Sequence, residues 1–222
     1  MIDTAIYLPK LLECLHQQFG TRLVYAGLQG SYLRNEATET SDIDIMVVIE
    51  KLSAFDLDTY RSIIQSLGNF EKSCGFICSR NDLANWNPLE ICHLLHSTKD
   101  LYGNLAELVP EYCNDDIRNF VKMSVNNLYH EICHRYIHSS TDKNIARLTG
   151  TYKGVFFILQ NLCYLSCGRF PLTKAELIPL LEGKDLAVFQ RSLELNRGIQ
   201  HDFFNSFDLL FTWCQETISR LN

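Results

Sequence analysis

The sequence lacks several patterns that would assign it to a special class of protein. No apolar run approaches the ~20 residues that a transmembrane helix needs, and the N-terminus MIDTAIYLPK lacks the basic-then-apolar order of a signal peptide. The nine cysteines are odd in number and form no CxxC pair, which is typical of reduced, buried thiols rather than of a disulfide framework. We therefore expect a cytoplasmic protein without membrane contact.

Basic charge, repeats and low-complexity segments are missing as well. The 222 residues include 20 Lys and Arg against 26 Asp and Glu, a formal net charge of -6. A nucleic-acid-binding surface favours a basic excess, so this balance argues against a nucleic-acid partner. With 46% hydrophobic and 21% charged residues, the composition is that of a folded chain of one large domain or two domains of ~100 residues each. It leaves the oligomeric state open.

The chain changes character near residue 110. Before this point, runs rich in β-branched residues alternate with helical periodicity. The predicted strands are 22–28, 43–49 and 74–79, and the predicted helices are 4–19, 54–67 and 88–97. After this point, apolar residues recur at three- and four-residue spacings. The helices predicted there are 114–138, 145–167, a short one that Pro171-Leu172-Thr173 opens, 184–196 and 201–220. We expect an α+β fold, with a small mixed β-sheet domain over 1–110 and an α-helical bundle domain over 111–222.

Two aspartates stand at the start of the second predicted strand. Asp42 and Asp44 are two residues apart, so their carboxylates project from one face while Ile43 and Ile45 point to the other. Hard oxygen ligands on a rigid strand suit Mg²⁺ that carries a nucleoside triphosphate. Such an ion neutralises phosphate charge and polarises an attacking hydroxyl. The pattern predicts a metal site at Asp42 and Asp44.

A glycine–serine pair, Gly30-Ser31, is separated from Asp42 by ten residues. Gly30 follows the first predicted strand, and a residue without a side chain lets phosphate approach the backbone closely. The hydroxyl of Ser31 and the amides of the following turn can bind phosphate oxygens. An isolated DxD is usually a solvated turn, but strand, glycine turn and acid-bearing strand here follow in order. We therefore predict that Gly30 and Ser31 bind the phosphates of a nucleotide.

This arrangement resembles the polymerase-β-type nucleotidyltransferase superfamily, and within it the bacterial aminoglycoside adenylyltransferases of the streptomycin/spectinomycin type. Cys74–Trp86 (CGFICSRNDLANW) is similar to their third strand and turn, and Tyr164–Lys174 (YLSCGRFPLTK) to the end of a long helix and a lysine-bearing turn. The resemblance covers most of the chain, although only the first motif is sharp. It implies an Mg²⁺-dependent enzyme that transfers a nucleoside monophosphate, AMP in the first instance, to a hydroxyl of a small-molecule acceptor such as an aminoglycoside-like compound, with ATP or another NTP as co-substrate. It also implies that Lys174 contacts the triphosphate.

The sequence departs from this family in two places. The family has a third carboxylate, as metal ligand or general base, but Cys74 falls at that position and cysteine is a poor Mg²⁺ ligand. Glu71 can serve as the catalytic base if the strand starts earlier. The acids that hold the antibiotic's amines also have no match, since Gly150-Thr151 stands there. The acceptor therefore stays open, and the alternative is a catalytically degenerate nucleotide-binding protein that acts as a sensor or antitoxin-like partner.

Two further patterns compete with this interpretation. His130-Glu131-Ile132-Cys133-His134 matches HExxH, in which both histidines bind Zn²⁺ and the glutamate acts as base. Three fixed positions match by chance easily, so we favour a polar helix surface there. Helical RNase toxins carry arginine followed by histidine after four to six residues, a spacing that is absent from this sequence, and we disfavour that class.

Overall fold

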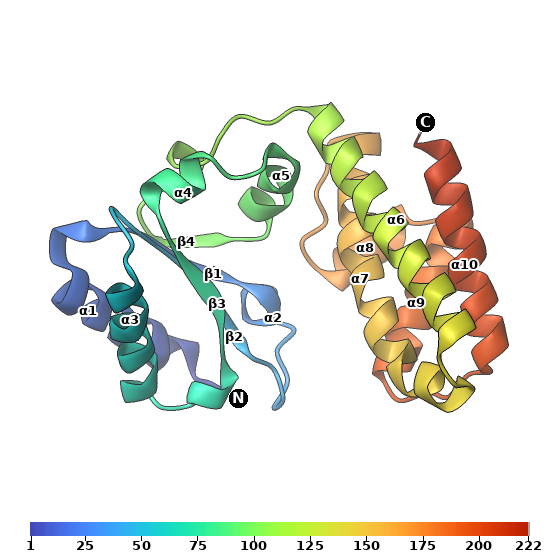
Figure 1. The fold of residues 1–222 in the computed structure, drawn as a ribbon, viewed down its shortest axis with the longest axis horizontal. Helices are drawn as coiled ribbons and strands as arrows, with labels where there is room; N and C mark the ends of the chain where they lie inside the picture. The colour runs from blue at the N-terminus through green and yellow to red at the C-terminus, as the bar shows by residue number, and fades with distance from the viewer. Residues whose placement is uncertain (222) are drawn as a thin grey trace. The chain divides into compact units, whose positions relative to one another are not determined.

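A computed structural model describes residues 1–221 and divides the chain into two compact units, residues 1–112 and residues 113–222. The first holds a small mixed β-sheet with helices, and the second is made of helices (Figure 1). The predicted fold class is confirmed. In residues 1–221, no helix combines the length and the hydropathy needed to cross a membrane.

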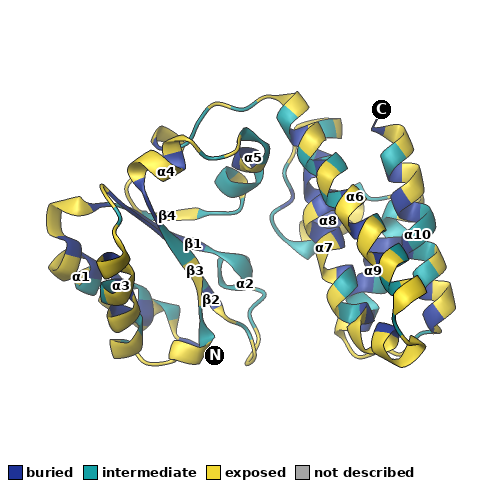
Figure 2. Cartoon of the chain, viewed as in Figure 1, coloured by how far each residue is buried: buried dark blue, intermediate teal, exposed yellow. Residues whose placement is uncertain are grey.

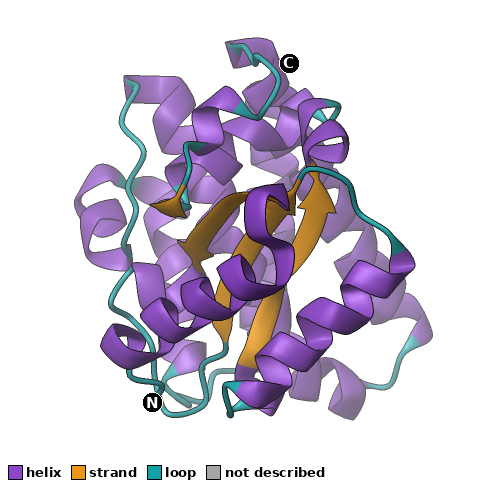
Figure 3. Ribbon diagram, turned by 90° about the vertical axis from the view of Figure 1, so that its left-hand side faces the viewer, coloured by secondary structure: helices purple, strands orange, loops and turns teal. Residues whose placement is uncertain are grey.

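Four strands form the sheet of the first unit, in the order β3-β2-β1-β4. Figure 3 shows strands in orange and helices in purple. Strand β1 pairs antiparallel with both β2 and β4, whereas β2 pairs parallel with β3. The bounds of the strands are Leu23–Gln29 for β1, Ile43–Ile49 for β2, Ser73–Ser79 for β3 and Lys99–Tyr102 for β4. The sequence predicted β1 to β3 to within one residue at each end. It missed β4, because this four-residue edge strand reads KDLY and has no apolar run.

One face of the sheet packs against α1 (Thr4–Phe19) and α3 (Ala54–Ser66). Alternate residues of β2 point to this side, and they share a buried core with the inner stripes of both helices. The fully buried members of this core include Leu11, Leu15, Ile43, Val47 and Ile49. Figure 2 shows the opposite faces of both helices as largely exposed. This packing holds β2 in place and therefore fixes the positions of the side chains on its other face.

The other face of the sheet is covered over only part of its length. Tyr25, Met46 and Val48 are buried there in a second core, together with residues that follow β3. The covering elements are α4 (Arg80–Ala84), α5 (Pro88–His96) and η3 (Leu105–Glu107). Asp44, on the same face, is half-buried and stands outside that core. The covering layer thus leaves the beginning of β2 accessible.

The second unit consists of helices around one core that includes Tyr152, Phe189 and Trp213. Its elements are α6 (Asn114–His138), α7 (Thr141–Cys167), α8 (Lys174–Leu177), η4 (Ile178–Leu180), α9 (Gly183–Asn196) and α10 (Phe203–Arg220). Helix α7 begins four residues earlier than the sequence predicted. The reason is a cap, since the Ser140 side chain accepts a hydrogen bond from the Lys143 backbone N–H.

Candidate functional site

The glycine–serine turn and the second aspartate meet in the structure. Strand β1 ends at Gln29, which lies opposite Asp44 in the antiparallel register, and helix α2 (Gly30–Leu33) follows directly. Gly30 has a φ of 69°, and a Cβ built on it would lie 1.9 Å from Asp44 Oδ2. Because both the left-handed backbone and the close approach exclude a side chain, only glycine fits here. The Asp44 carboxylate therefore lies directly against the turn that we predict to bind phosphate.

Asp42 and Ser31 complete the predicted set in this region. Asp42 lies just before β2 and is exposed, while Ser31 lies in α2 and is half-buried. The connection between them is held by its own hydrogen bonds, because the Ser41 hydroxyl accepts from the Thr38 backbone N–H at 2.8 Å. The Glu36 backbone N–H donates to the Ser31 carbonyl at 2.9 Å. The first unit thus brings Gly30, Ser31, Asp42 and Asp44 to the beginning of β2.

An ion pair that the sequence interpretation missed lies behind α2. Arg34 Nε is 3.2 Å from Glu36 Oε2, and the two side chains are 11% and 18% exposed. Burial, with the charges of Arg34 and His96 as further causes, lowers the pKa of His93 to about 4. His93 is therefore neutral at physiological pH, and the charge of Arg34 is compensated by Glu36. In the sequence, the position of Arg34 three residues after Ser31 could have indicated a charged group near this turn.

Cys74 is the neighbour of Asp44 on β3. The two residues are partners in the parallel β2–β3 register, so their side chains project from the same face of the sheet. Partial burial of the thiol raises the pKa of Cys74, and its hydrogen bond with Asp44 and the charges of Asp44 and Asp42 raise it further. The thiol is therefore neutral at physiological pH. A neutral thiol makes Cys74 unsuited to act as the base.

Glu71 lies outside the strand that carries Cys74. It belongs to η2 (Phe70–Lys72), its side chain is exposed, and β3 begins at Ser73. The earlier strand start that would let Glu71 serve as a base is not found in the structure. Its neighbour Lys72 donates from Nζ to the Glu39 carbonyl at 2.7 Å, which ties η2 to the loop before Asp42.

Lys174 is the first residue of α8 and belongs to the second unit. The turn before it is fixed in two ways. Thr173 and Glu176 form a reciprocal capping box, and Gln160 Nε2 donates to the Pro171 carbonyl at 2.7 Å. The half-buried Lys174 therefore extends from a well-ordered helix start.

The two aspartates fit a Mg²⁺ ion that arrives with a nucleotide. Among residues 1–221, no group of three or more His, Cys, Asp or Glu side chains is arranged to hold a metal by itself. Mg²⁺ usually binds through one or two carboxylates, with substrate phosphates and water supplying the remaining ligands. Asp42 and Asp44 beside Gly30 meet that requirement, whereas the Cys74 thiol adds no hard ligand.

The HExxH residues lie on α6. His130 and His134 have ring centroids 6.0 Å apart, and among residues 1–221 neither belongs to a group of three or more His, Cys, Asp or Glu side chains that could hold a metal. Glu131, which would act as the base, accepts a hydrogen bond from Arg135 at 2.8 Å. His130, Glu131 and His134 are exposed, as residues of a polar helix surface are.

The segment Gly150-Thr151 carries an arginine contact. Thr151 Oγ1 accepts a hydrogen bond from Arg135 at 2.7 Å, and the Arg135 side chain is 14% exposed. The same guanidinium pairs with Glu131 at 2.8 Å, so its charge is compensated. The segment thus lacks the acids that, as the resemblance implies, hold an aminoglycoside in the resistance enzymes.

Comparisons with known proteins support the sequence interpretation. A family model described as a nucleotidyltransferase domain matches residues 8–74. The solved structure of spectinomycin adenyltransferase AAD(9) from Enterococcus faecialis, with ATP and spectinomycin, is similar with a TM-score of 0.62 and 14% identity over 98% of this chain and 100% of that chain. No curated protein matches. The family match confirms the predicted likeness to nucleotidyltransferases over residues 8–74, and at 14% identity the structural likeness shows a shared fold.

Proposed function

Since residues 8–74 form a nucleotidyltransferase domain, we propose that the protein transfers AMP from ATP to a hydroxyl of a small-molecule acceptor. The observation that carries the proposal is the contact of the Asp44 carboxylate with Gly30, which unites a phosphate-binding turn with a metal-binding acid. The acceptor hydroxyl attacks the α-phosphorus in line, forming a new P–O bond as the bond to pyrophosphate breaks. The hydroxyl proton passes to solvent.

Each residue of the site has a separate task in this reaction. Gly30 leaves room for phosphate against the backbone, and the Ser31 hydroxyl donates to a phosphate oxygen. Asp42 and Asp44 hold Mg²⁺, which when bound neutralises phosphate charge and polarises the acceptor hydroxyl. Lys174 of the second unit contacts the triphosphate, as the resemblance implies. Catalysis rests mainly on positioning and charge compensation.

The acceptor that we propose is not an aminoglycoside. The supporting observation is the arginine-bonded Thr151, which stands where the resemblance would require acids. The similar structure contains spectinomycin, whereas no acidic residue stands at Gly150-Thr151 in this chain.

The first test is calorimetric titration with a non-hydrolysable ATP analogue, with and without Mg²⁺. The wild type is compared with the Asp42→Asn/Asp44→Asn double variant, which keeps the side-chain shapes and removes both charges. We expect Mg²⁺-dependent binding that is lost in the variant. If the wild type binds none of the analogues of ATP, GTP, CTP and UTP, the proposal is contradicted.

The Cys74–Asp44 contact favours a second candidate, a nucleotide-binding sensor that has lost the chemistry. It shares the binding step with the enzyme and differs in turnover. Release of pyrophosphate from ATP and Mg²⁺ in the presence of pooled hydroxyl compounds distinguishes the two. Binding without any pyrophosphate release supports the sensor, and acceptor-dependent release supports the transferase.

Replacing Glu71 with glutamine is expected to change turnover less than about twofold, because Glu71 is exposed in η2 and is not part of β3, the strand that pairs with Asp44. The measurement is kcat of the pyrophosphate release. A loss of 10²-fold or more, the range typical of a missing general base, would assign the base to Glu71 after all.

Replacing Cys74 with aspartate is expected to raise turnover by roughly tenfold or more, because it places a carboxylate beside Asp44, where it can accept a proton or bind the metal. Two carboxylates side by side repel each other, so the variant should also melt at a lower temperature without Mg²⁺ and recover with it. Cys74→Asn is the matched neutral control. Equal turnover of the two variants would show that this position does not limit the reaction.

A further inference from the structure

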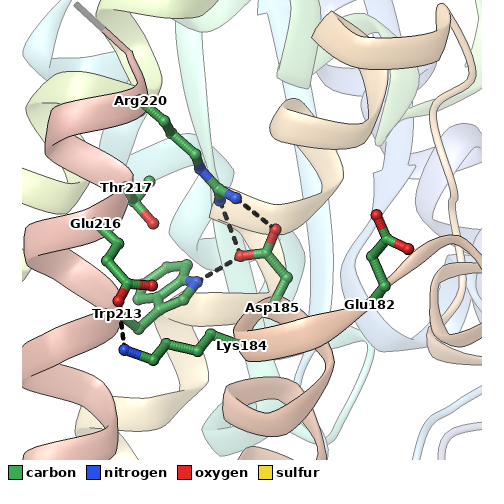
Figure 4. Close-up of a pocket in the computed structure, with 7 residues that line it drawn as sticks. All are labelled: Glu182, Lys184, Asp185, Trp213, Glu216, Thr217 and Arg220. Atoms are coloured by element: carbon green, nitrogen blue, oxygen red, sulfur yellow. Dashed lines mark hydrogen bonds and ion pairs between the residues drawn. The ribbon is translucent and has the colours of Figure 1, made fainter.

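The second unit contains a pocket that plays no part in the nucleotide site described above. Its volume is about 210 Å³, and its walls come from the beginning of α9 and the last turns of α10 (Figure 4). Trp213 forms one wall, and charged side chains surround it. This space corresponds to about seven water molecules at ~30 Å³ each. The pocket can therefore enclose a small organic molecule or one group of a larger one.

Four of the five charges around the pocket are paired with each other. Asp185 accepts a hydrogen bond from Trp213 Nε1 at 2.6 Å and two from Arg220, both at 2.8 Å. Lys184 forms an ion pair with Glu216. Figure 4 shows both pairs, with the Asp185–Arg220 pair above the indole ring. Because both cationic side chains already hold carboxylates, neither offers an uncompensated charge to an anion.

Two groups at the pocket have no partner among residues 1–221. The Thr217 hydroxyl belongs to a residue that is 1% exposed, and it forms no hydrogen bond. It points to the side on which Asp185 and the Trp213 ring lie (Figure 4). Buried polar groups are nearly always satisfied in native proteins, so an unsatisfied hydroxyl in a pocket wall points to a ligand.

The second group is the Glu182 carboxylate. Glu182 is the N-cap residue of α9 and is exposed, and its side chain makes no capping hydrogen bond. The ion pairs at the pocket within residues 1–221 join other residues. Three carboxylates and two cationic side chains line the pocket, so its net charge is negative by one, and the excess lies on Glu182.

We propose that this pocket binds a small organic cation, with an ammonium group that pairs with Glu182 and a hydroxyl that bonds to Thr217. The site lies within the second unit, and it does not depend on the proposed nucleotide transfer.

The probe for this site is serinol, the amino analogue of glycerol, titrated into ¹⁵N-labelled protein. The chain has two tryptophans, and a Trp86→Phe variant assigns their indole N–H resonances. We expect a saturable shift of the Trp213 indole resonance with serinol. Glycerol has the same shape without the charge, and glycerate carries a negative charge. At equal ionic strength, both should leave the resonance in place.

Two variants separate the groups that the proposal invokes. Glu182→Gln removes the charge without removing a cap, and it should weaken serinol binding at least tenfold. Thr217→Val keeps the shape and should weaken binding about threefold or more. Asp208→Asn, an exposed charge change on α10, should bind like the wild type. No serinol shift, a stronger response to glycerate, or unchanged affinity in Glu182→Gln would each overturn the proposal.

Discussion

Replacing Asp44 with alanine is expected to lower nucleotide turnover by about a thousandfold or more. The carboxylate that contacts Gly30 is then missing, and with it a ligand that holds the metal against the phosphates. Loss of one pre-organised electrostatic group commonly costs 10²–10³ in kcat, and a metal ligand supports several such interactions at once. The measurement is kcat for pyrophosphate release at saturating Mg²⁺ and acceptor.

Unfolding must be excluded as the cause of that loss. Asp44 projects from the face of β2 that the α1/α3 core does not use, so its removal should leave the melting temperature within a few degrees of the wild type. Asp58→Ala, an exposed carboxylate on α3, controls for the general effect of removing one negative charge. Turnover in Asp44→Ala comparable to that of Asp58→Ala would refute the assignment of the metal site.

Local patterns carried most of what the sequence could predict about the fold. Strands β1 and β2 have continuous apolar or β-branched runs, and their bounds follow from these runs alone. The spacing of Asp42 and Asp44 predicts side chains on one face of the chain because strand geometry has a period of two. The contact between Gly30 and Asp44 follows from the same local logic, since an antiparallel β1–β2 pair places the end of one strand beside the beginning of the other.

What the sequence could not predict depends on residues distant along the chain. The pairing of β3 with β2 is parallel and needs a crossover through α3, so local patterns do not give the register of Cys74 with Asp44, and only the family resemblance indicated it. The buried Arg34–Glu36 ion pair could not be predicted, because the fold buries it and no sequence periodicity indicates the burial of a charged pair. The unpartnered hydroxyl of Thr217 becomes visible only once α9 and α10 are brought together.

Replacing Gly30 with alanine is expected to abolish Mg²⁺-dependent binding of the ATP analogue, with a loss of affinity of roughly a hundredfold. The new Cβ would lie 1.9 Å from Asp44 Oδ2, so the carboxylate must rotate away from the turn, and the metal loses its ligand. The left-handed backbone at a φ of 69° adds about 1–2 kcal/mol of strain for any residue with a Cβ.

Gly154→Ala is the matched control for that substitution, because Gly154 lies inside α7 and a Cβ there meets nothing within 4 Å. This change should raise the free energy of unfolding by about 0.5–1 kcal/mol, since alanine is the better helix former, and it should leave nucleotide binding unchanged. Gly30→Ala should instead lower the free energy of unfolding, measured by thermal unfolding, and weaken nucleotide binding, measured by calorimetry. Wild-type affinity in a folded Gly30→Ala variant would mean that phosphate does not approach the chain at this turn, and the nucleotide site would have to lie elsewhere.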